Sequence, residues 1–224
     1  MIPRVLECSH CGGPVGYRAP FCPYCRSALT WTGPPSVERG GPILSRDYRH
    51  HEITGALVTT TIDHGADGAL VSVTGPFRVI ELDHPARDTV TSVEGVVLDR
   101  GGALGVVVRA FADGALFTGY VASVIPAFRA FRLSRNVEGA EVSTMRALSD
   151  WEACEAVRPL GEVNVIELRA ADSLLEVHVN GQRMLSLVDS GLAFGASGFR
   201  VFSLEQRARV LVRRLDVHEA VAGK

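Results

Sequence analysis

The sequence predicts an all-β domain, a sandwich or a barrel, that follows a small metal-stapled module. Four cysteines stand in two close pairs within the first 25 residues. From residue 53 onward, short runs rich in Val, Ile, Leu, Phe and Thr alternate with Gly, Asp, Asn and Pro, which is typical of regularly spaced β-strands. A stretch rich in Gly and Pro, residues 33–42, separates the two parts and indicates a linker.

The cysteine pairs Cys8-x2-Cys11 and Cys22-x2-Cys25 have the spacing of a four-thiolate zinc site. A segment of this length buries too little apolar surface to fold alone, whereas thiolate-bound zinc contributes roughly 10–16 kcal/mol of folding free energy. Four protein ligands close the coordination shell, so we expect one structural Zn²⁺ and not a catalytic metal. A pair of disulfides is the alternative.

Length and composition set further bounds. The chain has 224 residues and a formal net charge of -2, so no strong field favours a nucleic acid or an anionic membrane. No apolar run is long enough for a transmembrane helix, and the segment before Cys8 is too short for a signal peptide. We therefore expect a cytoplasmic protein with reduced thiols. Cys154 is expected to be a small apolar residue, buried or half-buried.

These signals divide the chain into four segments: a zinc ribbon over 1–30, a linker over 31–52, a β-sandwich over 53–219 and a tail over 220–224. Trp31, directly after the ribbon, is expected to cap the ribbon or to pack it against the next domain. Residues 149–156 are compatible with a short helix. Strands are predicted near 55–62, 68–74, 77–82, 90–98, 104–111, 116–124, 128–134, 140–145, 163–170, 173–179, 183–188, 198–204 and 207–218.

The most sharply defined hairpin lies late in the chain. Leu175, Val177 and Val179 share one face of a strand, which places Glu176 and His178 on the opposite, solvent-facing side. The dipeptide Asn180-Gly181 follows and supplies the two positive φ angles of a type I′ turn.

The last strand changes phase along its length. Val210 and Val212 share one face, whereas Leu215 and Val217 fall on the other in strict alternation. A β-bulge near Arg213-Arg214 brings all four side chains to the same face.

A series of motifs in the second half of the chain follows the order and spacing of a known superfamily. The motifs are the buried run 105–109 ending in Arg109, the strands 117–123 and 128–133, the asparagine-led strand 164–168, the hairpin 177–181, Asp189, Gly195, Gly198 and a closing strand ending near Val217. The stretch from about Val93 to Glu219 thus resembles the concanavalin A-like, or laminin G-like, jelly-roll superfamily, and it looks most like the bacterial 3-keto-disaccharide hydrolase-like domains. The resemblance implies a jelly-roll β-sandwich and a bacterial source.

The catalytic motif of the glycoside hydrolases in that superfamily is missing. Those enzymes carry Glu-x-Asp-x-Glu on one strand, which sets two carboxyl groups about 5–5.5 Å apart. The nearest approaches here are Glu81-x-Asp83, followed by His84, and Asp216-x-His218, which are more typical of solvated strand ends. We therefore expect no catalytic residues and no enzymatic activity.

Other candidate binding residues are weaker. A calcium ion at a loop rim could use Asp63, Asp67 or Asp113, and His50-His51 is a histidine pair without a third ligand nearby. Aromatic residues make up only 7% of the chain, and both tryptophans, Trp31 and Trp151, lie outside the clear strands. The residues expected in the core from their strand context are Phe77, Phe111, Phe117, Tyr120, Phe128 and Phe131.

These observations favour a non-catalytic interaction protein, in which the ribbon docks and the sandwich binds a protein partner or assembles with itself. The first alternative is a carbohydrate-binding or glycan-processing domain, a reading that rests on fold analogy. Nucleic-acid binding through the ribbon is the second alternative, because residues 1–30 carry three arginines against one glutamate and three aromatic residues. The arginines of 207–214 are expected to be strand-face and edge charges that discourage aggregation.

Overall fold

The computed structural model describes residues 8, 10–13, 22, 24–27, 36–53, 61–74, 78–113, 116–138 and 143–222. Trp31 lies outside these described residues, and so does the expectation attached to it. The chain divides into two compact units. One consists of Met1–Ser36 with Ala222–Lys224, and the other is Val37–Val221.

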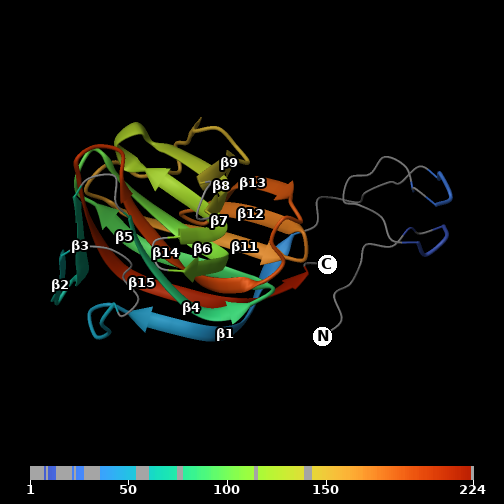
Figure 1. The fold of residues 1–224 in the computed structure, drawn as a ribbon, viewed down its shortest axis with the longest axis horizontal. Coiled ribbons are helices and arrows are strands. Elements are labelled where there is room, and N and C mark those ends of the chain that lie inside the picture. Colours follow the sequence, from blue (N-terminus) through green and yellow to red (C-terminus); the bar gives the residue numbers. More distant parts are fainter. Residues whose placement is uncertain are drawn as a thin grey trace. The chain divides into compact units, whose positions relative to one another are not determined.

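The larger unit consists of two antiparallel sheets packed face to face (Figure 1). The first sheet has the strand order β13-β12-β11-β5-β15-β3-β2, and β1 pairs with β15 at its side. Its strands are β1 (Val37–Asp47), β2 (Thr61–Gly65), β3 (Gly68–Thr74), β5 (Thr89–Val97), β11 (Val163–Ala171), β12 (Leu174–Val179), β13 (Gln182–Val188) and β15 (Arg207–Ala222).

The second sheet has the strand order β10-β8-β7-β6-β14-β4, and β9 pairs with β8. Its strands are β4 (Arg78–Ala86), β6 (Gly102–Asp113), β7 (Leu116–Ile125), β8 (Ala130–Glu138), β9 (Ser143–Ala147), β10 (Glu152–Ala153) and β14 (Gly195–Ser203). A 3₁₀ turn, η1 (Pro126–Phe128), joins β7 to β8. The structure confirms the predicted all-β jelly-roll sandwich, and in its described residues no helix is long and apolar enough to cross a membrane.

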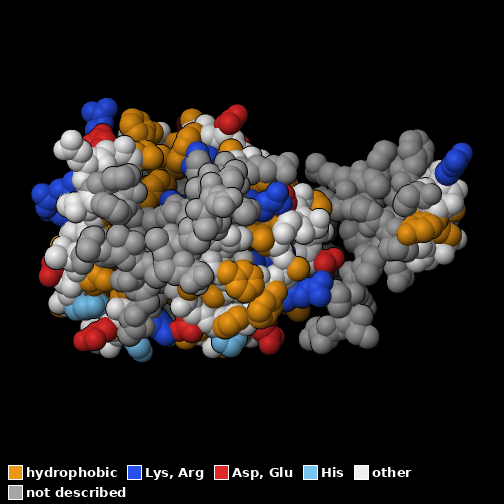
Figure 2. All heavy atoms as spheres, viewed as in Figure 1, with side chains coloured by type: hydrophobic (Ala, Val, Ile, Leu, Met, Phe, Trp, Pro, Cys, Tyr) orange, Lys and Arg blue, Asp and Glu red, His pale blue; other side chains and the backbone are white. Residues whose placement is uncertain are grey.

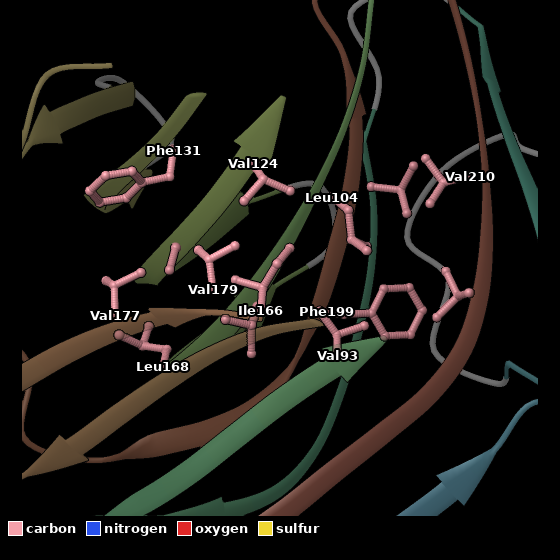
Figure 3. Close-up of a cluster of buried hydrophobic side chains, with 14 of the residues drawn as sticks. Val93, Leu104, Val124, Phe131, Ile166, Leu168, Val177, Val179, Phe199 and Val210 are labelled. Atoms are coloured by element: carbon pink, nitrogen blue, oxygen red, sulfur yellow. The ribbon is translucent and has the colours of Figure 1, made fainter. Parts of the chain in front are cut away.

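The core lies between the two sheets and follows the alternation of the strands. On the first sheet, Val93, Ile166 and Val177 point inward, and side chains such as Leu104 and Phe199 meet them from the second sheet (Figure 3). Each of these five side chains is at most 1% exposed. Because complete burial of such a side chain contributes roughly 1.5–3 kcal/mol, this shared core holds the two sheets together.

Two local predictions are confirmed. Asn180 and Gly181 both have positive φ, 50° and 83°, and join β12 to β13. The register of β15 against β5 shifts between Val212 and Arg214, which is the predicted bulge and brings Leu215 and Val217 into the core.

The expected linker 31–52 reaches too far, because the structure places residues 37–47 in strand β1 of the sandwich. The sequence Gly40-Gly41-Pro42 predicts a linker but lies within strand β1, for a physical reason. Gly40 lets β1 approach β15 closely, since a Cβ at this position would lie 3.1 Å from the Glu219 carbonyl oxygen. A proline such as Pro42 is tolerated in a strand that pairs on one side only.

The expected short helix at 149–156 is wrong, since β10 and turns occupy this segment. The expected solvent exposure of Glu176 and His178 is wrong as well, because the two residues are only 1% and 9% exposed. Glu176 accepts a hydrogen bond from the backbone N–H of Val37, at the start of β1. A strand added from the N-terminal side therefore covers a sheet face that alternation alone assigns to solvent.

Candidate functional site

A polar cavity of about 330 Å³ lies where β1 ends, beside the β2–β3 turn, β5 and β15. It opens on the side of the first sheet that faces away from the core, because its β5 residue, Glu94, follows the inward-facing Val93. The residues that line it are Asp47, Arg49, Ala66, Asp67, Glu94, Arg213 and Arg214.

The bulge in β15 creates one wall of the cavity. Arg213 is the extra residue of the bulge, so Arg213 and Arg214 both reach the cavity while the residues on either side keep their core positions. A second wall is the β2–β3 turn, which Gly68 brings close to the bulge. Gly68 has a φ of +132°, and a Cβ there would lie 2.4 Å from the Val212 carbonyl oxygen.

A buried tyrosine positions the third wall, at the end of β1. Tyr48 is 1% exposed, and its ring meets that of Phe199 edge-to-face with a centroid distance of 5.7 Å. Its backbone N–H donates to the Arg213 carbonyl oxygen over 2.9 Å. Because Tyr48 is fixed on both sides, its neighbours Asp47 and Arg49 are held at the cavity wall.

Asp47 and Arg49 form a forked ion pair. The Arg49 Nε donates to both carboxylate oxygens of Asp47, at 2.8 and 3.1 Å, and Nη2 donates to Oδ2. These hydrogen bonds lower the pKa of Asp47 well below its usual range and raise that of Arg49. The pair is therefore a fixed set of charges across the whole physiological pH range.

The remaining charges of the cavity differ in how far they are bound by other residues. Arg214 donates to Asp216 Oδ1 over 2.9 Å and to the Ser45 hydroxyl over 3.2 Å. Arg213 Nη1 and Glu94 Oε1 are 4.0 Å apart, at the limit of an ion pair. Asp67 is exposed in the turn. Arg213, Glu94 and Asp67 therefore offer polar atoms toward the cavity.

Three carboxylates and three guanidinium groups line the cavity, so their charges balance. Such a lining suits a neutral ligand with several hydroxyl groups, because each hydroxyl can donate to a carboxylate and accept from a guanidinium group.

Sequence reasoning missed most of this cavity. It singled out Asp67 as a possible calcium ligand, and the phase change in β15 located the bulge at Arg213-Arg214. Asp47 and Arg49 fell in the expected linker, and Glu94 carries no local signal. Gly68, the first residue of the predicted strand 68–74, is a further signal of a close backbone approach.

In the smaller unit, the four predicted cysteines lie together. Their sulfur atoms are all within 4.8 Å of one another, with 3.6 Å between Cys8 and Cys25 and 3.7 Å between Cys11 and Cys22. A tetrahedron with metal–sulfur bonds of about 2.3 Å has an edge of roughly 3.8 Å. Disulfide-bonded sulfurs are only about 2.05 Å apart, so the geometry fits a metal site and not the disulfide alternative.

The two cysteine loops have the same backbone geometry. In the first, the Cys8 N–H donates to the Gly13 carbonyl and the Gly12 N–H donates to the Cys8 carbonyl. In the second, Cys22 and Arg26 make the equivalent bonds. Gly12 and Arg26 both have positive φ, 70° and 57°. Each loop also turns one N–H toward the sulfur of its first cysteine, at 3.4 Å. Such donors stabilise thiolate charge.

Two of the other acidic candidates, Asp83 and Asp216, are engaged in the fold. Asp83 pairs with Arg46, and its Oδ1 accepts from the His84 N–H over 2.7 Å. Asp216 accepts from the Ser45 hydroxyl over 2.6 Å. Asp113 and Glu81 have side chains outside the described part, and Asp63 is exposed on β2. Among the described residues, the cysteine cluster is the single group placed to hold a metal.

The aromatic residues divide into two groups. Phe117, Tyr120 and Phe131 are in the core as predicted, each at most 1% exposed. Phe111 and Phe128 are each 54% exposed, so the expectation of burial is wrong for these two. Both stand where the regular alternation is interrupted, by a bulge in β6 and by η1, and strand context therefore misplaces them. Phe77 lies outside the described residues.

The arginines of 207–214 lie on an interior strand, β15. Arg209 binds Asp99 with two hydrogen bonds of 2.9 and 3.0 Å. Since β15 lies between β5 and β3, the expected role of these arginines in protecting a sheet edge is wrong. On the face shown in Figure 2, basic and acidic side chains of the described part are interspersed.

No protein-family model and no curated protein sequence matches the chain. Solved structures do share its β-sandwich fold. The carbohydrate-binding module CBM66 from Bacillus subtilis matches with a TM-score of 0.60 and 16% identity, over 75% of this chain and 97% of that one. A protein of unknown function with a galectin-like fold from Bacillus subtilis matches with a TM-score of 0.61 and 15% identity, over 83% and 99%.

A glucanase structure shares the β-sandwich fold as well. The β-glucanase of Bacillus licheniformis matches with a TM-score of 0.51 and 9% identity, over 81% of this chain and all of that one. The expectation of a protein-docking scaffold is corrected by these findings, because the sandwich is like that of a carbohydrate-binding module and a glucanase. At such identities the likeness shows the fold alone.

Proposed function

We propose that the sandwich is a non-catalytic carbohydrate-binding domain and that the cavity beside the β15 bulge holds one sugar unit. The observation that carries the proposal is the charge-balanced lining of three carboxylates and three guanidinium groups on rigid elements. At about 330 Å³ the cavity is at the small end of ligand sites, which suits a single sugar ring better than an extended chain. The fold likeness to a carbohydrate-binding module supports the same reading.

We also propose that the four cysteines hold one structural zinc ion. The support is the donor set of four thiols and the sulfur separations of 3.6 and 3.7 Å, close to the edge of a zinc–thiolate tetrahedron. All four positions belong to the protein, so this ion would contribute to folding and would not activate a substrate.

The binding site can be tested with the whole chain on a glycan array, followed by calorimetry with the oligosaccharide that gives the strongest signal. The double variant Asp67→Asn, Glu94→Gln keeps the shape of the cavity. It replaces two charged carboxylates, which can accept hydrogen bonds from sugar hydroxyls, with neutral amides. We expect its affinity to fall at least tenfold, because each hydrogen bond to a charged group is worth about 1.5–3 kcal/mol.

Asp63→Asn is the matched control, since Asp63 is an exposed carboxylate on the neighbouring strand β2 and does not line the cavity. It should bind as the wild type does. Absence of any glycan signal from correctly folded wild-type protein would end the proposal.

A further inference from the structure

Two exposed phenylalanines stand side by side at one end of the sandwich. Phe111, near the end of β6, is 54% exposed, and Phe194, in the β13–β14 loop, is 49% exposed. Their ring centroids are 6.3 Å apart and the ring planes are inclined by 48°. Two adjacent rings that are each about half exposed form a compact apolar surface that a ligand can cover.

The loop that carries Phe194 is held in place by buried polar groups. Asp189 accepts from the Tyr120 hydroxyl over 2.5 Å and from Arg135 Nη1 over 2.7 Å. Leu192 donates its N–H to the Tyr120 hydroxyl and accepts from Arg109 Nη1 through its carbonyl. Phe194 is therefore presented on a preorganised loop, which lowers the entropic cost of binding.

Polar groups lie beside the rings on the same face. Phe111 pairs with Thr118, and Tyr120 pairs with Arg135, across adjacent strands. Because Thr118 and Tyr120 are two residues apart on β7, their side chains and those of their partners share one face. The Thr118 hydroxyl and the partly exposed guanidinium group of Arg135 thus accompany the aromatic pair.

The exposed area of the two rings indicates the size of ligand that they can bind. A phenylalanine offers 150–250 Å² at most, so two half-exposed rings offer about 200 Å². A stable protein interface needs about 800 Å² from each partner, which is far more. One face of a pyranose ring has about the right size. It also fits chemically, because it presents C–H groups to the aromatic rings while its hydroxyls reach polar groups at the rim.

We propose that Phe111 and Phe194, with Thr118 and Arg135 beside them, form a second carbohydrate contact that stacks one pyranose ring of a longer glycan. This aromatic platform shares no residue with the cavity and is built on the second sheet and the β13–β14 loop. The inference rests on the proposed function and adds to it a preference for chains over single sugars.

The test uses the whole chain in native gels that contain a neutral polysaccharide: a β-1,3-glucan, a mixed-linkage β-glucan, a xylan, a mannan or a fructan. In the gel that retards the wild type most, Phe111→Ala and Phe194→Ala should each weaken binding roughly tenfold. Phe194→Tyr should bind as the wild type does, because it keeps an aromatic ring that can stack on the sugar. Melting temperatures should change little, since both rings are half in water.

Phe128→Ala is the matched control, because Phe128 is also 54% exposed and lies outside the platform. Three results would overturn the platform alone: wild-type binding by both alanine variants, equal weakening by Phe128→Ala, or conversion of a dimer into a monomer by the alanine changes. A wild type that binds none of the polysaccharides and no array glycan would overturn both this inference and the proposed function.

Discussion

Arg109 shows how one buried side chain organises an entire end of the sandwich. It is 1% exposed and has a φ of +52°, an unusual backbone angle for arginine. Its Nε donates to the Arg87 carbonyl over 2.8 Å, and Nη2 lies 3.2 Å from Asp88 Oδ1. Burial lowers the pKa of Arg109 and the charge of Asp88 opposes that shift, so the guanidinium group stays charged.

Replacement of this side chain should be costly. Arg109→Met keeps most of the volume but leaves the Arg87 and Leu192 carbonyls without their donor. We expect the free energy of unfolding to fall by about 3 kcal/mol, as measured by urea denaturation, because breaking a buried charged network typically costs 3–5 kcal/mol. Arg87→Met is the control, since that side chain is half-exposed, and a similar loss there would contradict the special role of Arg109.

At the scale of elements, β1 shows how a sequence signal can be overridden. Val37 begins the strand and is fully buried, and its N–H and carbonyl are bound by Glu176 and Arg169. Glu167 accepts from Arg169 Nε over 2.6 Å and pairs with Arg39 of β1. Strict alternation alone would place Glu167 and Glu176 on a solvent-facing side of the sheet. Because β1 covers this side, the two glutamates instead hold β1 in place.

These contacts make the stability of the sandwich depend on pH. Burial alone would raise the pKa of Glu176, but His178, the Val37 N–H and Arg183 outweigh it and lower the pKa. Burial of Glu167 is outweighed in the same way by Arg39 and Arg169. A lowered pKa in the folded state adds stability above the unfolded pKa of about 4.3, and this stability is lost as the pH falls through the folded value.

The melting temperature should therefore be nearly flat from about pH 5 to 8 and should fall steeply below about pH 4. Glu176→Gln should melt at a lower temperature near neutral pH and should show a shallower acid decline, because one of the titrating anchors is gone. Glu152→Gln, an exposed glutamate, should follow the wild-type profile. A melting profile of Glu176→Gln parallel to that of the wild type would show that this carboxylate does not anchor β1.

At the scale of the whole molecule, the chain consists of two units with different sources of stability. The sandwich depends on a core shared by two sheets. The smaller unit places four thiols within 4.8 Å, and a module of this size needs a metal or disulfides to fold. The two units should therefore unfold independently.

Cys22→Ser should abolish zinc binding and unfold the N-terminal module, while the main thermal transition of the sandwich should stay nearly unchanged. Metal analysis should give one zinc per chain for the wild type, and a strong chelator should reproduce the effect of the variant. Cys154→Ala is the control, because Cys154 is buried in the sandwich and should leave the zinc content intact. A single transition that shifts as a whole in Cys22→Ser would contradict two independent units.

Local features of the sequence were enough to predict the β class, the cysteine cluster, the Asn180-Gly181 turn and the bulge at Arg213-Arg214. Each depends on neighbours in the chain: the period of a strand, the spacing of thiols, a positive φ or a change of phase. Tertiary structure decided the membership of β1, the burial of Glu176 and the exposure of Phe111. It also brought Asp47, Glu94 and Arg213 to one cavity. These features depend on which strand covers which face, and that is fixed by pairings between residues far apart in the chain, which local periodicity does not encode.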